Sequence, residues 1–324
     1  MGYSFETTDI DGLVSLKEGE AADLDWPLFV TPAWLSAWWS VFGVSYRPFL
    51  AIARKDDSIL GVAPLKTEGD VASFMGSPDV VDYQDFIVNP SKEKEFFGFL
   101  LDELKKNTIN RLDLGALRPD SATLKYLKPL AGERGFDVSC QREDVSFELE
   151  LPSSFDGYPE MLDTKQRHEV RRQLRRLAGA GKVNYVPVTR TEEILAAMDR
   201  FIELMRLSHR DKARFMDEIM EDFFKCLAEN MAQAGLARLG QLELDGLVVA
   251  AVFCFDYNNT IYLYNSGFDP EYAGLGVGLM SKVFCIKDGI ELGRRYFDFL
   301  KGGEVYKARM GGSEVTLERC AINL

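Results

Sequence analysis

The sequence predicts a mixed α/β fold in which a similar succession of strands and helices occurs twice along the chain. Segments rich in β-branched and aromatic residues alternate with segments whose apolar residues have helical spacing. The chain has 324 residues, 46% of them hydrophobic and 27% charged, which is typical of a globular protein with room for two cores. Pro152, Ser153 and Ser154 follow a strand-like segment at residues 145–149. We therefore expect two domains, at residues 1–152 and 153–324.

The first half begins with an amphipathic helix after Thr31 and Pro32. Thr suits the residue before a helix and Pro suits its first position. Four large apolar residues follow at helical spacing, namely Trp34, Leu35, Trp38 and Phe42. Further on, the pattern predicts a helix at residues 92–107 and strands at residues 49–54, 58–66, 80–88 and 111–114.

The second half begins with a helix at residues 164–178. Asp163 and Gln166 have the spacing of a capping box, and Gly179 and Gly181 follow the last turn. Next come two helices, a hairpin that turns at Asp245-Gly246, a strand, a helix and a final strand, predicted at residues 192–208, 215–234, 236–244, 247–256, 260–268, 279–290 and 296–300. The two halves thus share an order of elements.

Composition and charge disfavour several classes of protein. A formal net charge of −13 opposes general binding to nucleic acid. The five scattered cysteines suggest neither a disulfide framework nor a zinc site, and the only histidines, His168 and His209, lie beside basic residues. No apolar segment approaches the ~20 residues of a membrane helix, and the N-terminus lacks the pattern of a signal peptide. We expect a cytoplasmic protein without a bound metal; no oligomeric state is predicted.

Three glycines, at positions 274, 276 and 278, stand between the predicted strand at residues 260–268 and the helix that follows it. Glycines at such a junction let backbone N–H groups approach a phosphate, and the helix dipole favours its charge. The spacing matches neither the phosphate loop of nucleotide hydrolases nor the dinucleotide fingerprint. The turn therefore predicts a phosphate site of another kind.

Position 273 with Gly276 and Gly278 resembles the Q/R-x-x-G-x-G/A coenzyme A loop of the GNAT acyltransferases, with Ala273 in place of Gln or Arg. The segments TPAWLSAWWSVFG (31–43), KQRHEVRRQLRRLAGAG (165–181) and D-F-L-x-G-x-x-x-Y-K (298–307) resemble motifs of one branch of that superfamily. This branch contains the cellulose-biosynthesis-type acetyltransferases and the Fem-type peptidyltransferases. The motifs have the order and separation that they have in this branch, so the resemblance extends over most of the chain.

The resemblance implies two tandem GNAT-like domains, each a mixed, mostly antiparallel sheet flanked by helices. It also implies that acetyl-CoA, or another acyl-CoA, binds the turn through Gly274, Gly276, Val277 and Gly278. The acyl group would pass to a small-molecule amine or amino-sugar acceptor.

The predicted helix at residues 164–178 carries six basic residues opposed by Glu169 alone. One interpretation is a solvated basic helix. The other is that Arg171, Arg172 and Arg175 hold phosphates of the cofactor or of a phosphorylated acceptor, because guanidinium groups bind phosphate in a bidentate manner.

Three residues near the end of the chain are candidates for catalysis. By the resemblance, Tyr306 would protonate the departing sulfur, unless it is an ordinary packed tyrosine. Lys307 could stabilise the oxyanion or bind an acceptor phosphate, or it could simply be exposed. Asp298 could act as a general base or orient Lys307, or it could accept N–H groups in the turn before Gly302.

Candidates for the acceptor site come from the first half. Tyr83 and Asp85 share one face of the predicted strand at residues 80–88, in a segment that resembles the family's substrate-side strand. An acidic groove there would suit a cationic amine. Trp38 could stack on a sugar ring, although its helical spacing also suits core packing.

Three functions remain open. The first is an acyl-CoA-dependent N-acyltransferase, for which polysaccharide or envelope metabolism is one expected role. The second is a Fem-type transferase that takes an aminoacyl group from tRNA, a partner that the charge of −13 disfavours. The third is a non-catalytic GNAT-like binding module, which Ala273 in the cofactor loop would fit.

Overall fold

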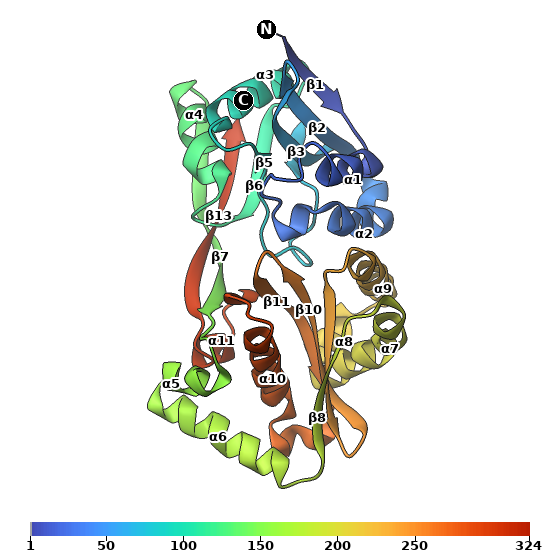
Figure 1. Cartoon of the computed structure of the whole chain (residues 1–324). Coiled ribbons are helices and arrows are strands. Elements are labelled where there is room, and N and C mark those ends of the chain that lie inside the picture. The colour runs from blue at the N-terminus through green and yellow to red at the C-terminus, as the bar shows by residue number, and fades with distance from the viewer. Residues whose placement is uncertain (1) are drawn as a thin grey trace. The chain divides into compact units, whose positions relative to one another are not determined.

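The computed structural model describes residues 2–324, which form two compact units (Figure 1). The first unit contains Met1–Val145 and Val315–Leu324, and the second contains Ser146–Glu314. The chain enters the second unit within strand β7 (Asp137–Glu150) and leaves it within strand β13 (Ser313–Asn323). The end of the chain thus belongs to the first unit, unlike the expected division at residue 152, because β13 pairs with a strand of that unit.

The first unit has the strand order β1-β2-β3-β4-β6-β13-β7, with β5 on β3. Its remaining strands are β1 (Tyr3–Thr7), β2 (Arg47–Lys55), β3 (Ser58–Glu68), β4 (Val71–Phe74), β5 (Ile87–Val88) and β6 (Arg111–Leu117). Its helices are α1 (Ile10–Glu18), α2 (Pro32–Phe42), α3 (Glu93–Lys106) and α4 (Lys128–Glu133). Strands β4 and β6 run parallel, whereas β2 and β3 are antiparallel along their full length.

The second unit has the strand order β7-β12-β11-β10-β9-β8. Its strands besides β7 are β8 (Val183–Val188), β9 (Ala237–Leu244), β10 (Leu247–Tyr257), β11 (Thr260–Phe268) and β12 (Tyr296–Lys301). Its helices are α5 (Tyr158–Met161), α6 (Thr164–Ala178), α7 (Thr191–Ser208), α8 (Arg210–Phe215), α9 (Glu218–Gln233), α10 (Val277–Glu291) and α11 (Val305–Arg309). Here β11 and β12 run parallel, whereas the pairs β8–β9, β9–β10 and β10–β11 are antiparallel.

The predicted mixed, mostly antiparallel α/β architecture is confirmed. In each unit a helix connects two strands that pair in parallel: α3 lies between β4 and β6 along the chain, and α10 lies between β11 and β12. Helix α6 has the bounds that the sequence predicts, and the Asp163 carboxylate accepts the N–H of Gln166 at 2.8 Å. A helix that connects two parallel strands thus occurs in both units, in keeping with the order of elements that the sequence repeats.

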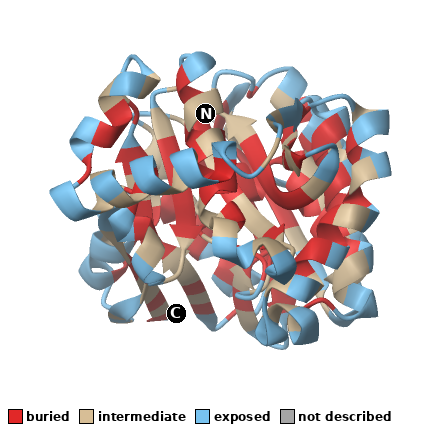
Figure 2. Ribbon diagram, turned by 90° about the horizontal axis from the view of Figure 1, so that it is seen from below, coloured by how far each residue is buried: buried red, intermediate tan, exposed pale blue. Residues whose placement is uncertain are grey.

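Each unit has an apolar core of its own. In the first, Phe86, Phe96 and Phe97 pack edge to face between α3 and the sheet, and in the second, Phe201 of α7 contacts Phe253 of β10 with ring centroids 5.7 Å apart. Burying each such ring contributes about 1.5–3 kcal/mol. Buried residues lie on the strands and on the helix faces turned toward them, with exposed residues on the outer faces (Figure 2). Of the helices in residues 2–324, none has both the length and the apolar character needed to span a bilayer.

Two predicted elements are wrong in part. The expected strand at residues 80–88 is reduced to Ile87–Val88, because the N–H groups of Val80 and Val81 both turn back to the Ser77 carbonyl. The expected helix at residues 215–234 begins later, at Glu218, since Asp217 is the N-cap of α9 and accepts the N–H of Met220 at 2.9 Å.

The expectation that the cysteines are unpaired is wrong for two of them. Cys140 of β7 and Cys320 of β13 form a disulfide in the first unit, with Cα atoms 4.1 Å apart. The residues are 180 positions apart in sequence, and only the return of the chain in β13 brings them together. Spacing along the sequence therefore could not reveal this pair.

Candidate functional site

The candidate site lies in the second unit, where the parallel pairing of β11 and β12 ends. The ladder joins residues 260–262 to residues 296–298, although β11 continues to Phe268. Just beyond it, Leu300 has a positive φ of 62° and the pairing of β12 with β7 is irregular. Side chains from neighbouring elements converge here, at the strand ends where α/β sheets bind ligands.

The predicted glycine turn forms the start of α10. Gly276 has a left-handed backbone with φ 71°, and no side chain caps the helix that it begins. The first amides of a helix have no partner within it, so this end favours an anion. A Cβ atom at Gly278 would lie 2.8 Å from the Phe268 ring, which explains glycine there. Val277, a predicted cofactor-binding residue, is fully buried and belongs to the core.

Helix α6 packs beside this loop through a face that includes Gln173 and Arg176. A Cβ atom at Gly276 would lie 2.6 Å from Gln173 Oε1, and one at Gly274 would lie 3.8 Å from an Arg176 guanidinium nitrogen. Gln173 Oε1 is buried without a hydrogen-bond partner. Arg176 is exposed, and no carboxylate among residues 2–324 forms an ion pair with it. Arg176 is therefore the arginine of α6 that lies at the glycine loop.

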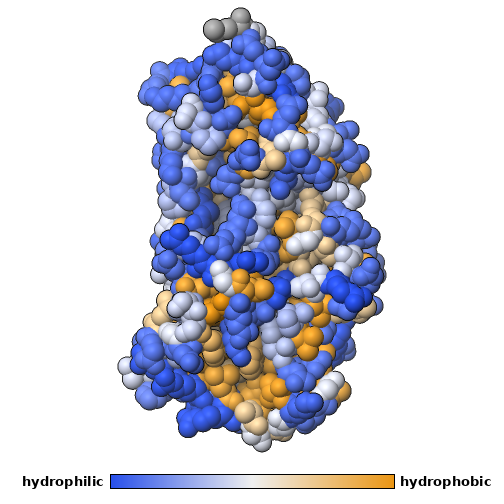
Figure 3. Space-filling view, in the orientation of Figure 1, coloured by the Kyte–Doolittle hydropathy of each residue, from blue (hydrophilic) through white to orange (hydrophobic). Residues whose placement is uncertain are grey.

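The three predicted phosphate-binding arginines are engaged elsewhere on the surface of α6. Arg171 pairs with Glu160 at 2.7 Å, and Arg172 pairs with Glu169 at 2.7 Å. Arg175 donates to the carbonyl of Arg171 at 3.3 Å. The outer face of this helix is hydrophilic in Figure 3, as a solvated basic helix would be. Residues three positions apart lie on the same face of a helix, so the spacing of Gln173 and Arg176 could have identified the face of α6 that contacts the glycine loop.

Two lysines and a tyrosine meet at the site from three helices. Lys282 of α10 is 8% exposed, donates to the Gly278 carbonyl at 2.9 Å and has its ammonium 5.2 Å from the centre of the Tyr306 ring. Lys212 of α8 donates to Asn265 Oδ1 at 2.9 Å and to the Ser266 carbonyl, both in the part of β11 that lies beyond its pairing with β12. Lys282 does not stand out in the sequence, because it lies within an apolar helical pattern.

Burial governs the ionisation of these groups. Burial, followed by repulsion from Lys212, lowers the pKa of Lys282 to about 7. Burial also lowers the pKa of Lys212 to about 8, against the attraction of Glu304. In contrast, burial and the nearby Glu304 carboxylate raise the pKa of Tyr306. At neutral pH the phenol is therefore a proton donor, while Lys282 exchanges its proton readily.

The other two predicted catalytic residues hold the backbone around the site. The Lys307 ammonium is 2% exposed and donates to the carbonyls of Leu300, Lys301 and Gly302 at 3.0, 2.6 and 3.1 Å. The Asp298 carboxylate is also buried, and accepts the N–H of Leu300 at 2.7 Å. These contacts correspond to the turn-stabilising interpretation of Asp298.

The predicted acceptor residues belong to the first unit. Trp38 is fully buried, donates to Ser77 Oγ at 3.2 Å and lies under the Lys66 ammonium at 4.8 Å. Tyr83 is 7% exposed and packs edge to face on Phe29. The Asp85 carboxylate accepts from the N–H groups of Ala122 and Thr123 and from the Thr123 hydroxyl. The expected strand that would have put Tyr83 and Asp85 on one face is absent at these positions.

Asp85 should make the stability of the protein depend on pH. Burial raises the pKa of Asp85 to about 6, against the lowering effect of its hydrogen bonds. A pKa raised by folding means that stability is greatest at low pH and falls as pH rises from about 4 to about 6, by about 3 kcal/mol. Asp85→Asn should remove this dependence. The measurement is the difference in Tm between wild type and variant across that range, and Asp57→Asn, in an exposed turn, should show no such difference.

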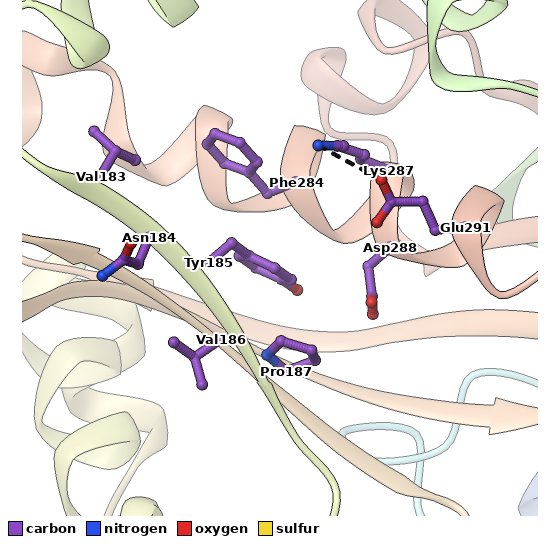
Figure 4. A pocket seen from close by; sticks show the side chains of 9 residues that line it. All are labelled: Val183, Asn184, Tyr185, Val186, Pro187, Phe284, Lys287, Asp288 and Glu291. Atoms are coloured by element: carbon purple, nitrogen blue, oxygen red, sulfur yellow. Dashed lines mark ion pairs between the residues drawn. The ribbon is translucent and has the colours of Figure 1, made fainter.

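A separate pocket of about 530 Å³ lies between β8 and α10 (Figure 4). Tyr185 and Phe284 stack in it with ring centroids 5.9 Å apart, and Lys287 pairs with Glu291 at 3.5 Å. Its lining includes none of the residues at the glycine loop or the strand ends. The pocket is thus distinct from the candidate site.

Three comparisons place the chain among known proteins. Residues 164–308 match the family model of an acetyltransferase (GNAT) domain. Curated proteins give no significant match. Among solved structures the chain is similar to FemX, with 11% identity and a TM-score of 0.69 over 98% of this chain and 96% of that one. It is also similar to a conserved protein of unknown function from Bacteroides thetaiotaomicron, with 12% identity and a TM-score of 0.64 over 100% of each chain.

The matched region contains helix α6, the glycine loop and Tyr306, so the family model covers the residues that build the site. The likeness to FemX extends the shared fold to nearly the whole chain. Residues 164–308 are therefore similar to a GNAT acetyltransferase domain, and the chain as a whole has a fold similar to that of FemX.

Proposed function

We propose that this protein is an acyl-CoA-dependent N-acyltransferase that acts in the cytoplasm on a small amine or amino sugar, with acetyl-CoA as the simplest donor. The observation that carries the proposal is the start of α10, where Gly276 leaves the helix uncapped beside the unpaired guanidinium of Arg176. Backbone amides and a guanidinium are the donor set that a pyrophosphate requires, so the residues present fit this group. The phosphates would contact Gly274, Gly278 and Arg176.

The donor supplies an activated acyl group as a thioester, and the residues at the strand ends would handle protons and charge. Tyr306, whose raised pKa keeps it protonated, would give its phenolic proton to the departing sulfur and would recover one from the amine nitrogen as that nitrogen is acylated. The Lys282 and Lys212 ammonium groups would give this part of the site a positive charge. Lys307 and Asp298 would fix the turn that presents Tyr306.

Tyr306→Phe tests the proton-donor role. The variant keeps the ring that packs against Phe299, 6.4 Å away between centroids, and removes only the hydroxyl. We expect kcat for acetyl transfer to fall by about 10²-fold with little change in KM for the donor. Steady-state kinetics with a panel of amines provides the measurement, and Tyr296→Phe, at the start of β12, is the matched control. An unchanged kcat in Tyr306→Phe would remove this residue from the mechanism.

A Fem-type reaction, with an aminoacyl-tRNA as donor, is the second candidate because the likeness to FemX covers 98% of the chain. The net charge of −13 opposes it. Thermal unfolding separates the two donors. A ligand at about 100 times its Kd stabilises by about 2.7 kcal/mol, so the true donor should raise Tm and the other should not. A shift with aminoacyl-tRNA and none with acetyl-CoA would replace the first proposal with the second.

A further inference from the structure

Lys282 is a buried cation and Lys212 is a half-buried one, and neither has a carboxylate partner among residues 2–324. Of the three N–H donors on each ammonium, Lys282 uses one, to the Gly278 carbonyl, and Lys212 uses two, to Asn265 and Ser266. All of these acceptors are neutral. No carboxylate in residues 2–324 lies within 4.0 Å of either ammonium.

The charged and titratable groups around the pair leave it with an excess of positive charge. The acid near Lys282 is Glu304, and its carboxylate already pairs with the Lys307 ammonium at 2.9 Å. The Tyr306 ring of α11 lies against the Lys282 ammonium, and the thiols of Cys254 on β10 and Cys285 on α10 are near enough to affect its charge. Burial holds the pKa of the Cys254 thiol well above its ordinary value, so this group remains neutral. The single charge of Glu304 thus acts on three lysines, which leaves an excess of positive charge at the site.

We propose that Lys212 and Lys282 bind the carboxylate of the acceptor, so that the amine acylated by this protein is an amino acid or another small amine bearing a carboxylate. This inference rests on the proposed function, because it names the substrate class of the same site. A bound carboxylate would supply two acceptor oxygens to the unused N–H donors of the two ammonium groups. The single negative charge of a carboxylate suits a pair of lysines that are only partly protonated at neutral pH. The phosphates of the donor would bind elsewhere, at the glycine loop.

Binding of this carboxylate is coupled to protonation. The anion binds the ammonium forms, so it raises the pKa of both lysines and takes up protons when the solution is near their free values. Burial lowers those values to about 7 for Lys282 and about 8 for Lys212. Affinity should be greatest below about pH 7 and should fall by at least about 10-fold toward pH 9, as the lysines lose their protons.

N-acetylglycine and N-acetylglycinamide are the probes that test this proposal. They share an acylated amine and differ in one charge, so the comparison isolates the carboxylate. With the full chain carrying ¹³C-labelled lysine, NMR titration gives both the affinity and the pKa of each lysine. We expect the acid to bind at least about 10-fold more tightly than the amide near pH 6.5 and to raise the pKa of Lys282. Equal affinities, or binding of neither probe, would overturn the proposal.

Variants locate the effect at the pair. Lys282→Met keeps the length of the side chain and removes the buried charge. It should weaken the binding of N-acetylglycine at least about 10-fold. Lys212→Met should raise the pKa of Lys282, because it removes the repulsion between them. Lys287→Met is the matched control, since this lysine is on the same helix, is 40% exposed and pairs with Glu291. Unchanged affinity in Lys282→Met would also overturn the proposal.

Acetyl-CoA binding, measured on the same samples, distinguishes a failure of the carboxylate site from a failure of the proposed function. If acetyl-CoA binds and N-acetylglycine does not, the acyltransferase assignment stands and the carboxylate site fails. If N-acetylglycine binds through Lys282 and acetyl-CoA does not, the carboxylate site stands and the acyl-CoA donor fails.

Discussion

Gly276→Trp should abolish the stabilisation of this protein by acetyl-CoA. Gly276 has a φ of 71°, and a Cβ atom there would lie 2.6 Å from Gln173 Oε1, so the indole has to displace α6 or cover the first amides of α10. Either result removes the phosphate site that we propose. In wild type, acetyl-CoA at about 100 times its Kd should raise the free energy of unfolding by about 2.7 kcal/mol. Thermal unfolding or calorimetry should show no such gain in the variant.

Gly293→Trp is the matched control for this result. Gly293 follows the other end of α10 with a φ of 70°, and no atom lies within 4 Å of a Cβ placed there. Both substitutions thus force a bulky residue into a left-handed conformation, at a cost of about 1–2 kcal/mol. The control should lose stability and keep acetyl-CoA binding. Normal binding by Gly276→Trp would contradict the assignment of the glycine loop.

A second variant isolates the contribution of α6. Arg176→Gln removes the guanidinium near Gly274 without changing the loop, and Arg172→Gln removes one that pairs with Glu169. A charge-assisted contact to phosphate contributes about 1.5–3 kcal/mol. Arg176→Gln should therefore weaken the binding of acetyl-CoA about 10-fold or more, and Arg172→Gln should not. Calorimetric titration of both variants measures the difference.

The local parts of this architecture could be predicted from the sequence because short-range rules determine them. Asp163 begins α6 through its own carboxylate, and Gly276 begins α10 through its left-handed backbone. The turn at Asp245 and Gly246 has both residues at positive φ, as a short hairpin requires. Each of these features depends on residues within a few positions of one another.

The parts that could not be predicted depend on tertiary burial. Lys282 follows Leu279 and precedes Val283 in an apolar helical pattern, where one lysine suggests a surface position. Its buried position becomes evident only when the ends of β11, α8 and α11 surround it. Similarly, Asp85 resembles a groove residue in sequence, but it accepts N–H groups of a turn 37 residues away. Long-range partners, absent from any local pattern, decide both roles.

Lys307→Met should destabilise the second unit by about 3 kcal/mol or more, and this loss decides between the structural and the catalytic interpretation of Lys307. Its three N–H donors reach the carbonyls of Leu300, Lys301 and Gly302, so no donor remains for a substrate. Removing the ammonium leaves the buried Leu300 carbonyl without its donor and takes the same donor from the part-buried carbonyls of Lys301 and Gly302. Thermal and denaturant unfolding measure the loss.

Two further variants separate the backbone contacts of Lys307 from its charge. Glu304→Gln removes only the ion-pair partner, whose side chain is 57% exposed, and should cost less than about 1 kcal/mol. Arg309→Met removes an exposed charge from the same helix and should leave Tm unchanged. If Lys307→Met instead kept its Tm and lost only kcat, Lys307 would act on the substrate. Because Leu300 is held at a positive φ between Asp298 and the Lys307 ammonium, we expect the loss of this lysine to release the turn that positions Tyr306.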